Sequence, residues 1–373
     1  MLFLLLTCFI LIIPISFYVL FSFRYESNIF RRFILKKITE ADQIQFLDSD
    51  SDISTIRSIL EYSMDKGNGL EANIALPAWY PLYNIESVDG DLWKRMKKNL
   101  HKVISKLNLK NITKLSEKYT TVLLMSNRLI TSKDFSIIPA QIYYELIFNE
   151  QLDVNEIEMF YTASIEWRKE IAVKGKGDIK IKKQFFDFFC KKLKSEDREV
   201  ISVYAQPFFI SPMINFSDIF VAIFKNREYF ISHNTVNFNN IVLESIRLYH
   251  PFPILERKYD LKDNHTYHSY IELDNFKQDR TFEPSRWNNK DKNIYEFIPF
   301  GIGSRRCTGK NIALETISAI LKTMVFYPGI NWSLICPEKD HVFSGRDNDL
   351  STSFDEISYQ LRFVLRIITD KLK

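Results

Sequence analysis

The run PFGIGSRRCTGKNIALETISAILKTMVF, residues 299–326, holds three of the chain's ten glycines within nine positions, at 301, 303 and 309. Ten glycines in 373 residues is far below the roughly 7% of ordinary proteins. Such a cluster indicates a backbone constraint, because glycine alone tolerates positive φ and close approach of other backbone. Apolar residues spaced by three and four after it predict a helix over 310–326. Cys307 therefore lies in a tight loop just before a helix.

The position of Cys307 predicts an ionised sulfur. The helix N-terminus and the charges of Arg305 and Arg306 are each expected to favour the thiolate over the thiol. A thiolate flanked by backbone amides suits an iron centre as axial ligand, because hydrogen bonds to sulfur tune the electron density that reaches the metal. A buried structural cysteine in a loop is the alternative that these residues leave open.

Residues 300–309, FGIGSRRCTG, resemble the haem-binding loop of the cytochrome P450 (haem-thiolate) family. The resemblance implies that Cys307 is the axial ligand of a haem iron, with Phe300 packed against its sulfur. It implies that Arg305 pairs with a haem propionate, for which the planar fork of arginine is well suited. From this loop the implied cofactor-binding residues are Phe300, Gly301, Arg305, Cys307 and Gly309, with Cys307 as the metal ligand.

Two upstream segments extend the resemblance. LESIRLYHPFPILER, residues 243–257, is similar to the family's ExxR helix and following strand, and FEPSRW, residues 282–287, is similar to its meander motif. Glu244 and Arg247 lie three apart on one helical face and can bond each other, and both could meet Arg286. The resulting buried ionic triad would have a structural role, locking the haem loop. Arg257 is implied as a second propionate partner.

A third segment, DGDLWKRMKKNL at 89–100, resembles the helix whose Trp and basic residue hold the propionates. Trp93 and Lys97 match those positions, although lysine lacks the bidentate fork of arginine. The neighbouring basic residues are a candidate docking face for an acidic electron donor, with ordinary solvated surface as the alternative. They are Arg95, Lys98, Arg306 and Lys310.

The oxygen-activating helix of the family departs from its usual pattern here. Its acid–Thr pair, which relays protons, is missing. The best placement runs through PFFISPMINFSDIF, residues 207–220, with Ile210 at the acid and Ser211 at the Thr. Ile210 cannot carry a proton, and Pro212 removes one helical hydrogen bond. The chain is short for the family, so it resembles a divergent member.

The N-terminus predicts a membrane anchor. Residues 1–23 carry no charge, and a helix of that length would span about 34 Å against a hydrocarbon core of ~30 Å. A cleaved signal peptide is the alternative, but no basic region precedes the run and no small-x-small site follows it. The basic residues of segment 24–37 place the remainder on the cytosolic side. The expected localisation is a single-pass membrane protein, of endoplasmic-reticulum type in a eukaryotic host.

Composition and periodicity complete the expected organisation. The chain has 46% apolar and 26% charged residues, typical of a globular protein, and its net charge of +4 gives no reason to expect a nucleic-acid partner. The apolar spacing predicts a mainly α fold with minor β. Helical spacing occurs at 91–106, 140–150, 154–173, 214–226, 238–249 and 310–326, and extended runs occur at 74–83, 252–258 and 357–366. Residues 38–373 are read as one cytochrome P450-like haem domain with small sheets. Segment 260–293, with His265 and His268, is expected to be surface loop.

The leading functional interpretation is a membrane-anchored haem-thiolate monooxygenase that inserts one oxygen atom from O₂ into an apolar, hydrophobic small molecule. An NADPH-dependent reductase or another donor would supply the electrons, since this chain has no phosphate-cradling glycine loop of its own. Two alternatives remain: a haem-thiolate isomerase or dehydratase of a peroxide substrate, and a non-catalytic haem-binding homologue. The sequence does not identify the substrate.

Overall fold

The structure is a computed structural model, and it describes residues 36, 39, 41–47, 52–67, 69, 72, 76–171, 176–232, 237–249, 254–260, 265–272, 281–288 and 298–340. Three sequence expectations lie outside these residues. They are the anchor over 1–23, all of the basic segment 24–37 except Lys36, and the extended run 357–366.

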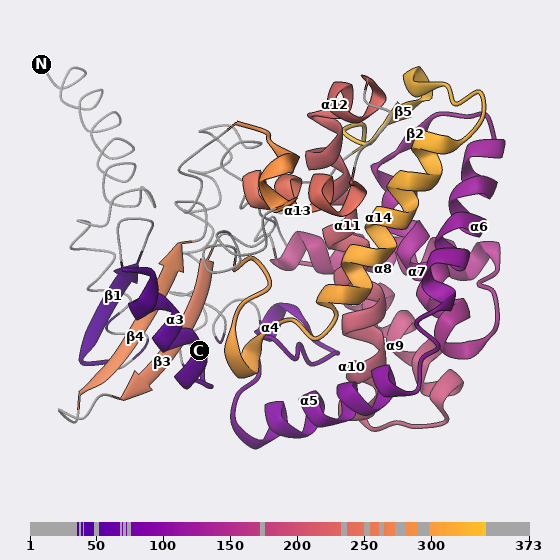
Figure 1. The fold of residues 1–373 in the computed structure, drawn as a ribbon. Helices are drawn as coiled ribbons and strands as arrows, with labels where there is room; N and C mark the ends of the chain where they lie inside the picture. Colours follow the sequence, from indigo (N-terminus) through magenta and orange to yellow (C-terminus); the bar gives the residue numbers. More distant parts are fainter. Residues whose placement is uncertain are drawn as a thin grey trace, which may run out of the picture.

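Helices account for most of the described chain (Figure 1). They are α3 (Ile53–Tyr62), α4 (Leu76–Ala78), α5 (Gly90–Ser105), α6 (Asn111–Met125), α7 (Ser132–Phe148), α8 (Val154–Ile171), α9 (Ile179–Leu193), α10 (Arg198–Ala205), α11 (Ser211–Phe224), α12 (Arg227–Ser232), α13 (Phe238–Leu248) and α14 (Lys310–Phe326). Short 3₁₀ turns lie at η4 (Pro284–Asn288), η5 (Gly303–Arg305) and η6 (Trp332–Leu334).

In the residues that the structure describes, two small sheets accompany the helices. The first has the order β1 (Gln43–Leu47), β4 (Thr266–Glu272), β3 (Ile254–Asp260), with β1 parallel and β3 antiparallel to β4. In the second, β2 (Ile130–Thr131) pairs in parallel with β5 (Ile335–Cys336). Figure 1 shows the three-stranded sheet and α3 on one side of the helical body, with the segment that precedes α14 lying between them. Cys307 belongs to that connecting segment.

Side-chain caps fix where several helices begin. At α7, Thr131 and Asp134 form a reciprocal capping box that satisfies backbone N–H groups of the first turn. Asp197 accepts a hydrogen bond from the backbone of Glu199 at the start of α10. The capping box explains why α7 begins at Ser132, earlier than the apolar spacing over 140–150 predicted.

A continuous helical stretch, Arg198–Phe224, runs through the core of the helical body. It is apolar and long enough to cross a membrane, but most of its side chains are buried against other helices, as in the core helix of a globular domain. It joins α10 and α11 through a π-helical turn, η2 (Gln206–Ile210). Phe135 of α7 stacks on Phe220 of α11 with ring centroids 4.3 Å apart. Apolar residues on nearly every face of α11 therefore reflect burial on all sides.

The structure corrects two expectations about extended and loop segments. The extended run predicted at 74–83 is wrong for its described part, where α4 and a succession of turns stand instead. Segment 260–293 is not all surface loop, because β4 forms the centre of the three-stranded sheet. The polar composition of β4 hid its burial: His268 and Ser269 are fully buried there.

Candidate functional site

The loop that carries Cys307 is shaped by two glycines in the left-handed region. Gly301 has φ +66° and Gly303 has φ +70°. A Cβ on Gly303 would also lie 2.6 Å from the carbonyl oxygen of Leu60 at the end of α3, so only glycine fits there. The N–H of Cys307 donates to the carbonyl of Phe300 at 2.7 Å, which closes the loop on itself. The sequence cluster of glycines thus has a geometric cause.

Cys307 is a half-buried residue, and its sulfur lies at the N-terminus of α14. It accepts backbone hydrogen bonds from Gly309 and Lys310. Burial raises the pKa of this thiol to about 11, with a smaller contribution from the nearby Glu86 carboxylate, and the two backbone donors and Lys97 only partly offset that rise. The expectation that the local charges favour a thiolate is therefore wrong for the free thiol, because loss of water outweighs the dipole and the cations.

A high pKa for the free thiol is compatible with a metal ligand, because a coordinated metal ion removes the thiol proton outright. The two backbone donors lie where they stabilise negative charge on sulfur. In the described part of the chain, no group of three or more His, Cys, Asp or Glu residues could hold a metal ion. A single cysteine thiolate is the protein donor that a haem iron takes as its axial ligand in haem-thiolate sites.

Lys97 lies beside the cysteine loop. Its ammonium donates to the carbonyl of Arg306 at 2.7 Å. Burial lowers the pKa of Lys97, while Glu86 and Cys307 act in the opposite direction, so all three groups lie close together. On the other flank of the loop, the ammonium of Lys310 lies 5.5 Å from the ring centroid of Phe300.

Arg305 and Trp93 come together at the start of α5. The guanidinium of Arg305 lies 4.4 Å from the ring centroid of Trp93 and is paired with the carboxylate of Asp89. Trp93 and Arg305 are both buried. The structure thus brings Trp93, Lys97, Arg305 and Cys307 into one region from two separate sequence segments.

The Glu244–Arg247–Arg286 triad is confirmed. The fully buried carboxylate of Glu244 accepts two hydrogen bonds from Arg247, at 2.7 and 2.9 Å, and one from Nε of Arg286 at 3.0 Å. It also accepts from the indole of Trp287 and the backbone of Glu283, both at 2.9 Å. These bonds join α13 to η4, and the carboxylate has a donor on every side.

Arg257 and His268 lie in the three-stranded sheet. Arg257 is 2% exposed, donates to the carbonyl of Glu256 at 2.7 Å and stands in register with Ser269. The expectation that His268 is a surface histidine is wrong: it is fully buried and lies 2.5 Å from the carboxylate of Glu256. His265 is exposed, as expected. The pair forms because Glu256 and His268 lie on the same face of neighbouring antiparallel strands.

The segment expected to replace the acid–Thr pair forms the π-helical turn and the start of α11. The N–H of Ser211 reaches back five residues to the carbonyl of Gln206. This wider turn accommodates Pro212, whose missing N–H and bulky ring disrupt an ordinary α-helical turn. Ile210 is fully buried. The amide of Gln206 donates to the hydroxyl of Ser211 at 2.7 Å, so the polar partner of Ser211 is an amide.

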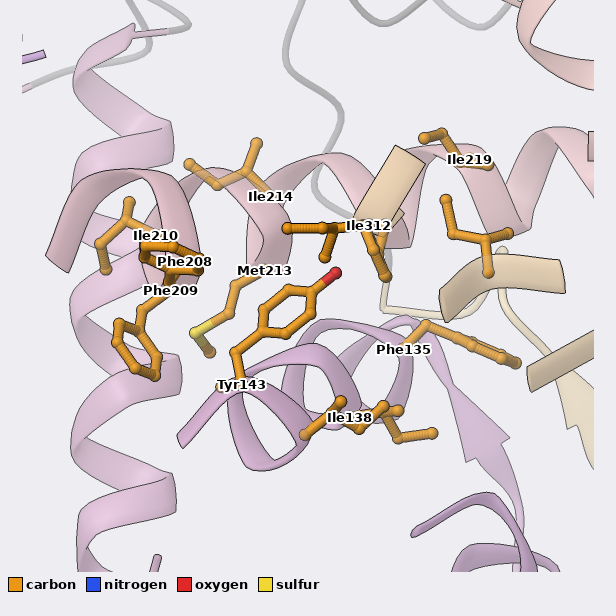
Figure 2. Close-up of a cluster of buried hydrophobic side chains, with 14 of the residues drawn as sticks. Phe135, Ile138, Tyr143, Phe208, Phe209, Ile210, Met213, Ile214, Ile219 and Ile312 are labelled. Atoms are coloured by element: carbon orange, nitrogen blue, oxygen red, sulfur yellow. The ribbon is translucent and has the colours of Figure 1, made fainter. Parts of the chain in front are cut away.

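Close-packed apolar side chains lie between this segment and α14. Figure 2 shows Tyr143 of α7 lying between Met213 of α11 and Ile312 of α14, with its hydroxyl end turned toward α14. That hydroxyl donates to Thr316 at 3.1 Å. Burial raises the pKa of Tyr143 above its usual value, and the charge of Cys307 adds to the rise. Tyr143 is therefore close enough to Cys307 for the two groups to interact electrostatically.

Sequence reasoning missed four residues near these groups: Glu86, Asp89, Tyr143 and Gln206. Asp89 stood in the quoted run 89–100, and its place four residues before Trp93 was the one available signal. The others had none, because Glu86, Tyr143 and Gln206 lie in segments whose contacts with the loop, α14 and Ser211 arise only on folding.

Comparison with known proteins gives one family. The family model for cytochrome P450 matches residues 266–327. A mitochondrial 1,25-dihydroxyvitamin D(3) 24-hydroxylase of Rattus norvegicus is 48% identical over 42 residues, which cover 11% of this chain and 8% of that protein. The match thus spans under a tenth of that relative's length.

Solved structures extend the similarity to the fold. A 6-coordinated cytochrome P450 from Thermus thermophilus aligns with TM-score 0.56 at 12% identity, over 76% of this chain and 84% of its own. A cytochrome P450, CYP175A1, from another strain of Thermus thermophilus aligns with TM-score 0.55 at 12% identity, over 73% and 79%. The predicted mainly α, cytochrome P450-like fold is confirmed. The family model over residues 266–327 and these solved structures agree on cytochrome P450, so they support membership of that family in the matched region and in the fold.

Proposed function

We propose that this protein is a membrane-anchored haem-thiolate monooxygenase with Cys307 as the axial iron ligand. The observation that carries the proposal is the geometry of the cysteine loop. Two left-handed glycines present the half-buried residue Cys307, whose sulfur accepts two backbone hydrogen bonds at the start of α14. A cysteine that only filled space would need neither the donors nor the partial exposure.

The residues proposed to hold the haem come from three regions. The loop supplies Cys307, with Phe300, Gly301 and Gly309 shaping its approach, and Arg305 fixes the loop from behind without contacting the haem. Helix α5 supplies Trp93 and Lys97, and β3 supplies Arg257. Bound haem would supply an iron centre that binds and reduces O₂. In the balanced reaction, two electrons and two protons are consumed, one oxygen atom enters the substrate and the other leaves as water.

The chain's own residues would set the conditions for that reaction. On the sulfur side, the N–H groups of Gly309 and Lys310 stabilise the thiolate charge. On the opposite side, we assign the segment from Gln206 to Ile214, whose buried apolar residues exclude bulk water. There the amide of Gln206 donates to the Ser211 oxygen, so the serine O–H keeps its own proton to donate.

The proposal extends to the partners and the compartment. The basic residues Arg95, Lys98, Arg306 and Lys310 are exposed around α5 and the cysteine loop, and we propose that an NADPH-dependent reductase or another acidic donor docks there. Residues 1–23 would anchor the chain in a membrane, residues 24–37 would hold the domain from residue 38 on the cytosolic side, and the substrate would be a hydrophobic small molecule.

The second candidate is an isomerase or dehydratase of a peroxide substrate, which needs iron and thiolate but no delivered protons. The buried Ile210 favours it, because an apolar side chain at the position proposed for the acid cannot relay a proton. A non-catalytic haem-binding homologue is the third candidate, and it would share the cofactor site without either reaction.

The experiment is a spectrum of the purified full chain after reduction and addition of carbon monoxide. Parent, Cys307→Ser and the control Cys336→Ser are compared, since Cys336 is also half-buried but lies in β5. We expect a strongly red-shifted Soret band in the parent and the control, lost in Cys307→Ser. A band that survives in Cys307→Ser, or no haem at all, refutes the proposal. Turnover with NADPH, reductase and O₂ then supports the monooxygenase, and turnover of a lipid hydroperoxide alone supports the second candidate.

A further inference from the structure

The guanidinium of Arg305 is occupied by the protein itself. Its Nε donates to the carbonyl of Met64 at 2.5 Å and its Nη1 to the carbonyl of Val88 at 2.8 Å, with a longer contact of 3.5 Å to the carbonyl of Glu86. Its Nη2 donates to the carboxylate of Asp89. The side chain is only 2% exposed. Most of the five N–H donors of a guanidinium thus already have acceptors.

Asp89 is fixed from the other side as well. It precedes α5, yet its carboxylate does not cap that helix. Both carboxylate oxygens accept from the backbone N–H of Lys66 at 3.0 Å, and one accepts from that of Gly67 at 2.8 Å. The Asp89–Arg305 pair therefore connects three separate segments: residues 64–67, the start of α5 and the cysteine loop. Bonds of this kind between ionised groups and backbone are stronger than neutral ones.

We propose that Asp89, rather than a haem propionate, is the carboxylate partner of Arg305, and that the pair locks the cysteine loop to the start of α5 before any haem binds. The lock gives the buried guanidinium a counter-charge within the protein, whereas releasing Asp89 would remove that counter-charge and leave two backbone N–H groups without their acceptor. A propionate brought to the same guanidinium would also meet the negative charge of Asp89.

The positive charge for the anionic edge of the haem then falls to Lys97. Its ammonium carries three N–H donors, and the carbonyl of Arg306 takes one of them. Lys97 stands on α5 one helical turn after Trp93 and next to the cysteine loop. This part of the inference rests on the proposed haem binding, whereas the Asp89–Arg305 lock is a property of the apoprotein.

The test uses the full chain purified without haem, in mild detergent, and two probes: iron protoporphyrin IX and its dimethyl ester, in which both propionates are neutral. The ratio of their dissociation constants measures the attraction to the propionate charges. The thermal midpoint of each apoprotein measures the lock. The variants are Asp89→Asn, Arg305→Lys, their double mutant and Lys97→Met.

We expect Asp89→Asn and Arg305→Lys each to lower the apoprotein midpoint by several degrees, and the double mutant to lower it little further, because both remove one interaction. Neither should change the ratio of dissociation constants more than about twofold. Lys97→Met should keep the midpoint and reduce the ratio about fivefold or more, a readout that a merely structural residue would not move.

The opposite pattern overturns the inference. In that pattern Arg305→Lys removes the tighter binding of iron protoporphyrin IX over its dimethyl ester, while Asp89→Asn leaves the thermal midpoint of the apoprotein unchanged. If Arg305→Lys does not fold, Asp89→Asn and Lys97→Met still decide between the two patterns. A parent chain that binds neither probe refutes the proposed function and the role of Lys97, and the apoprotein midpoints then judge the lock separately.

Discussion

Replacing Glu244 by glutamine tests whether the buried triad holds α13 to the meander segment. The carboxylate is fully buried, and each of its oxygens accepts at least two hydrogen bonds. Oε2 faces Nε of Arg247 and the indole N–H of Trp287, and Oε1 faces three further N–H donors, from Arg247, Arg286 and the backbone of Glu283. A glutamine amide in either orientation therefore points its NH₂ group at two or more donors.

The magnitude follows from these contacts. Losing two hydrogen bonds to a charged acceptor costs roughly 3–6 kcal/mol, since each contributes about 1.5–3 kcal/mol. The side chains of Arg247 and Arg286 are 13% and 20% exposed, so water recovers part of that loss. We expect Glu244→Gln to lower the free energy of unfolding by about 3–4 kcal/mol, within the range found when a buried ion pair loses one partner.

The assay is urea unfolding of the full chain in mild detergent, followed by tryptophan fluorescence. With a slope of about 3 kcal/mol per molar urea, the midpoint should fall by roughly 1 M. The matched control is Glu283→Gln in the same segment, whose carboxylate is 55% exposed and lies 3.5 Å from Arg286. We expect at most about 0.5 kcal/mol there. Equal midpoints for the two variants would refute this account of the triad.

Three further predictions follow from the same structure. Gly303→Ala should lower the thermal midpoint, because Gly303 has φ +70° and an added Cβ would lie 2.6 Å from a backbone oxygen. Gly309→Ala should leave the midpoint unchanged, because nothing lies within 4 Å of its Cβ. Equal midpoints for the two variants would contradict this prediction. In a chain whose other cysteines are serine, the rate of alkylation of Cys307 in the apoprotein should rise with a midpoint near pH 11 instead of the usual 8.5. The reason is that the thiolate is the nucleophile and burial raises the pKa of this thiol. A rate that levels off by pH 9 would refute the prediction. Phe209→Ala should cost about 3–5 kcal/mol in urea unfolding, because the ring is fully buried with centroids 5.0 Å from Phe189 and 5.4 Å from Phe160; a loss below about 1 kcal/mol, as expected for the exposed Val154→Ala, would exclude such packing.

Much of the helical fold was predictable because those helices carry local signals. Apolar residues repeat at three and four along α5, α8, α13 and α14, and each was predicted to within a few residues. The missed sheet centre shows the limit of such signals. The sequence of β4 looks polar because it contains His268 and Ser269, yet both are buried. His268 can be buried because it pairs with Glu256, which comes from another strand.

The sequence alone was enough to predict the cysteine loop and the Glu244–Arg247 part of the triad. Spacing within a short stretch decides which residues share a turn, so FGIGSRRCTG and the interval from Glu244 to Arg247 carried their geometry with them. A disturbance of the helix near Pro212 was also predictable, because proline removes a helical hydrogen bond wherever it stands, and the structure places a π-helical turn just before it.

The electrostatics around Cys307 and Arg305 depend on contacts that form when distant segments pack together. Arginines and a helix N-terminus suggested a thiolate, yet burial raises the pKa of the thiol, and Asp89 supplies the carboxylate that pairs with Arg305. Desolvation and ion pairing depend on which side chains crowd a point in space from distant parts of the chain, and a local sequence pattern contains no record of them.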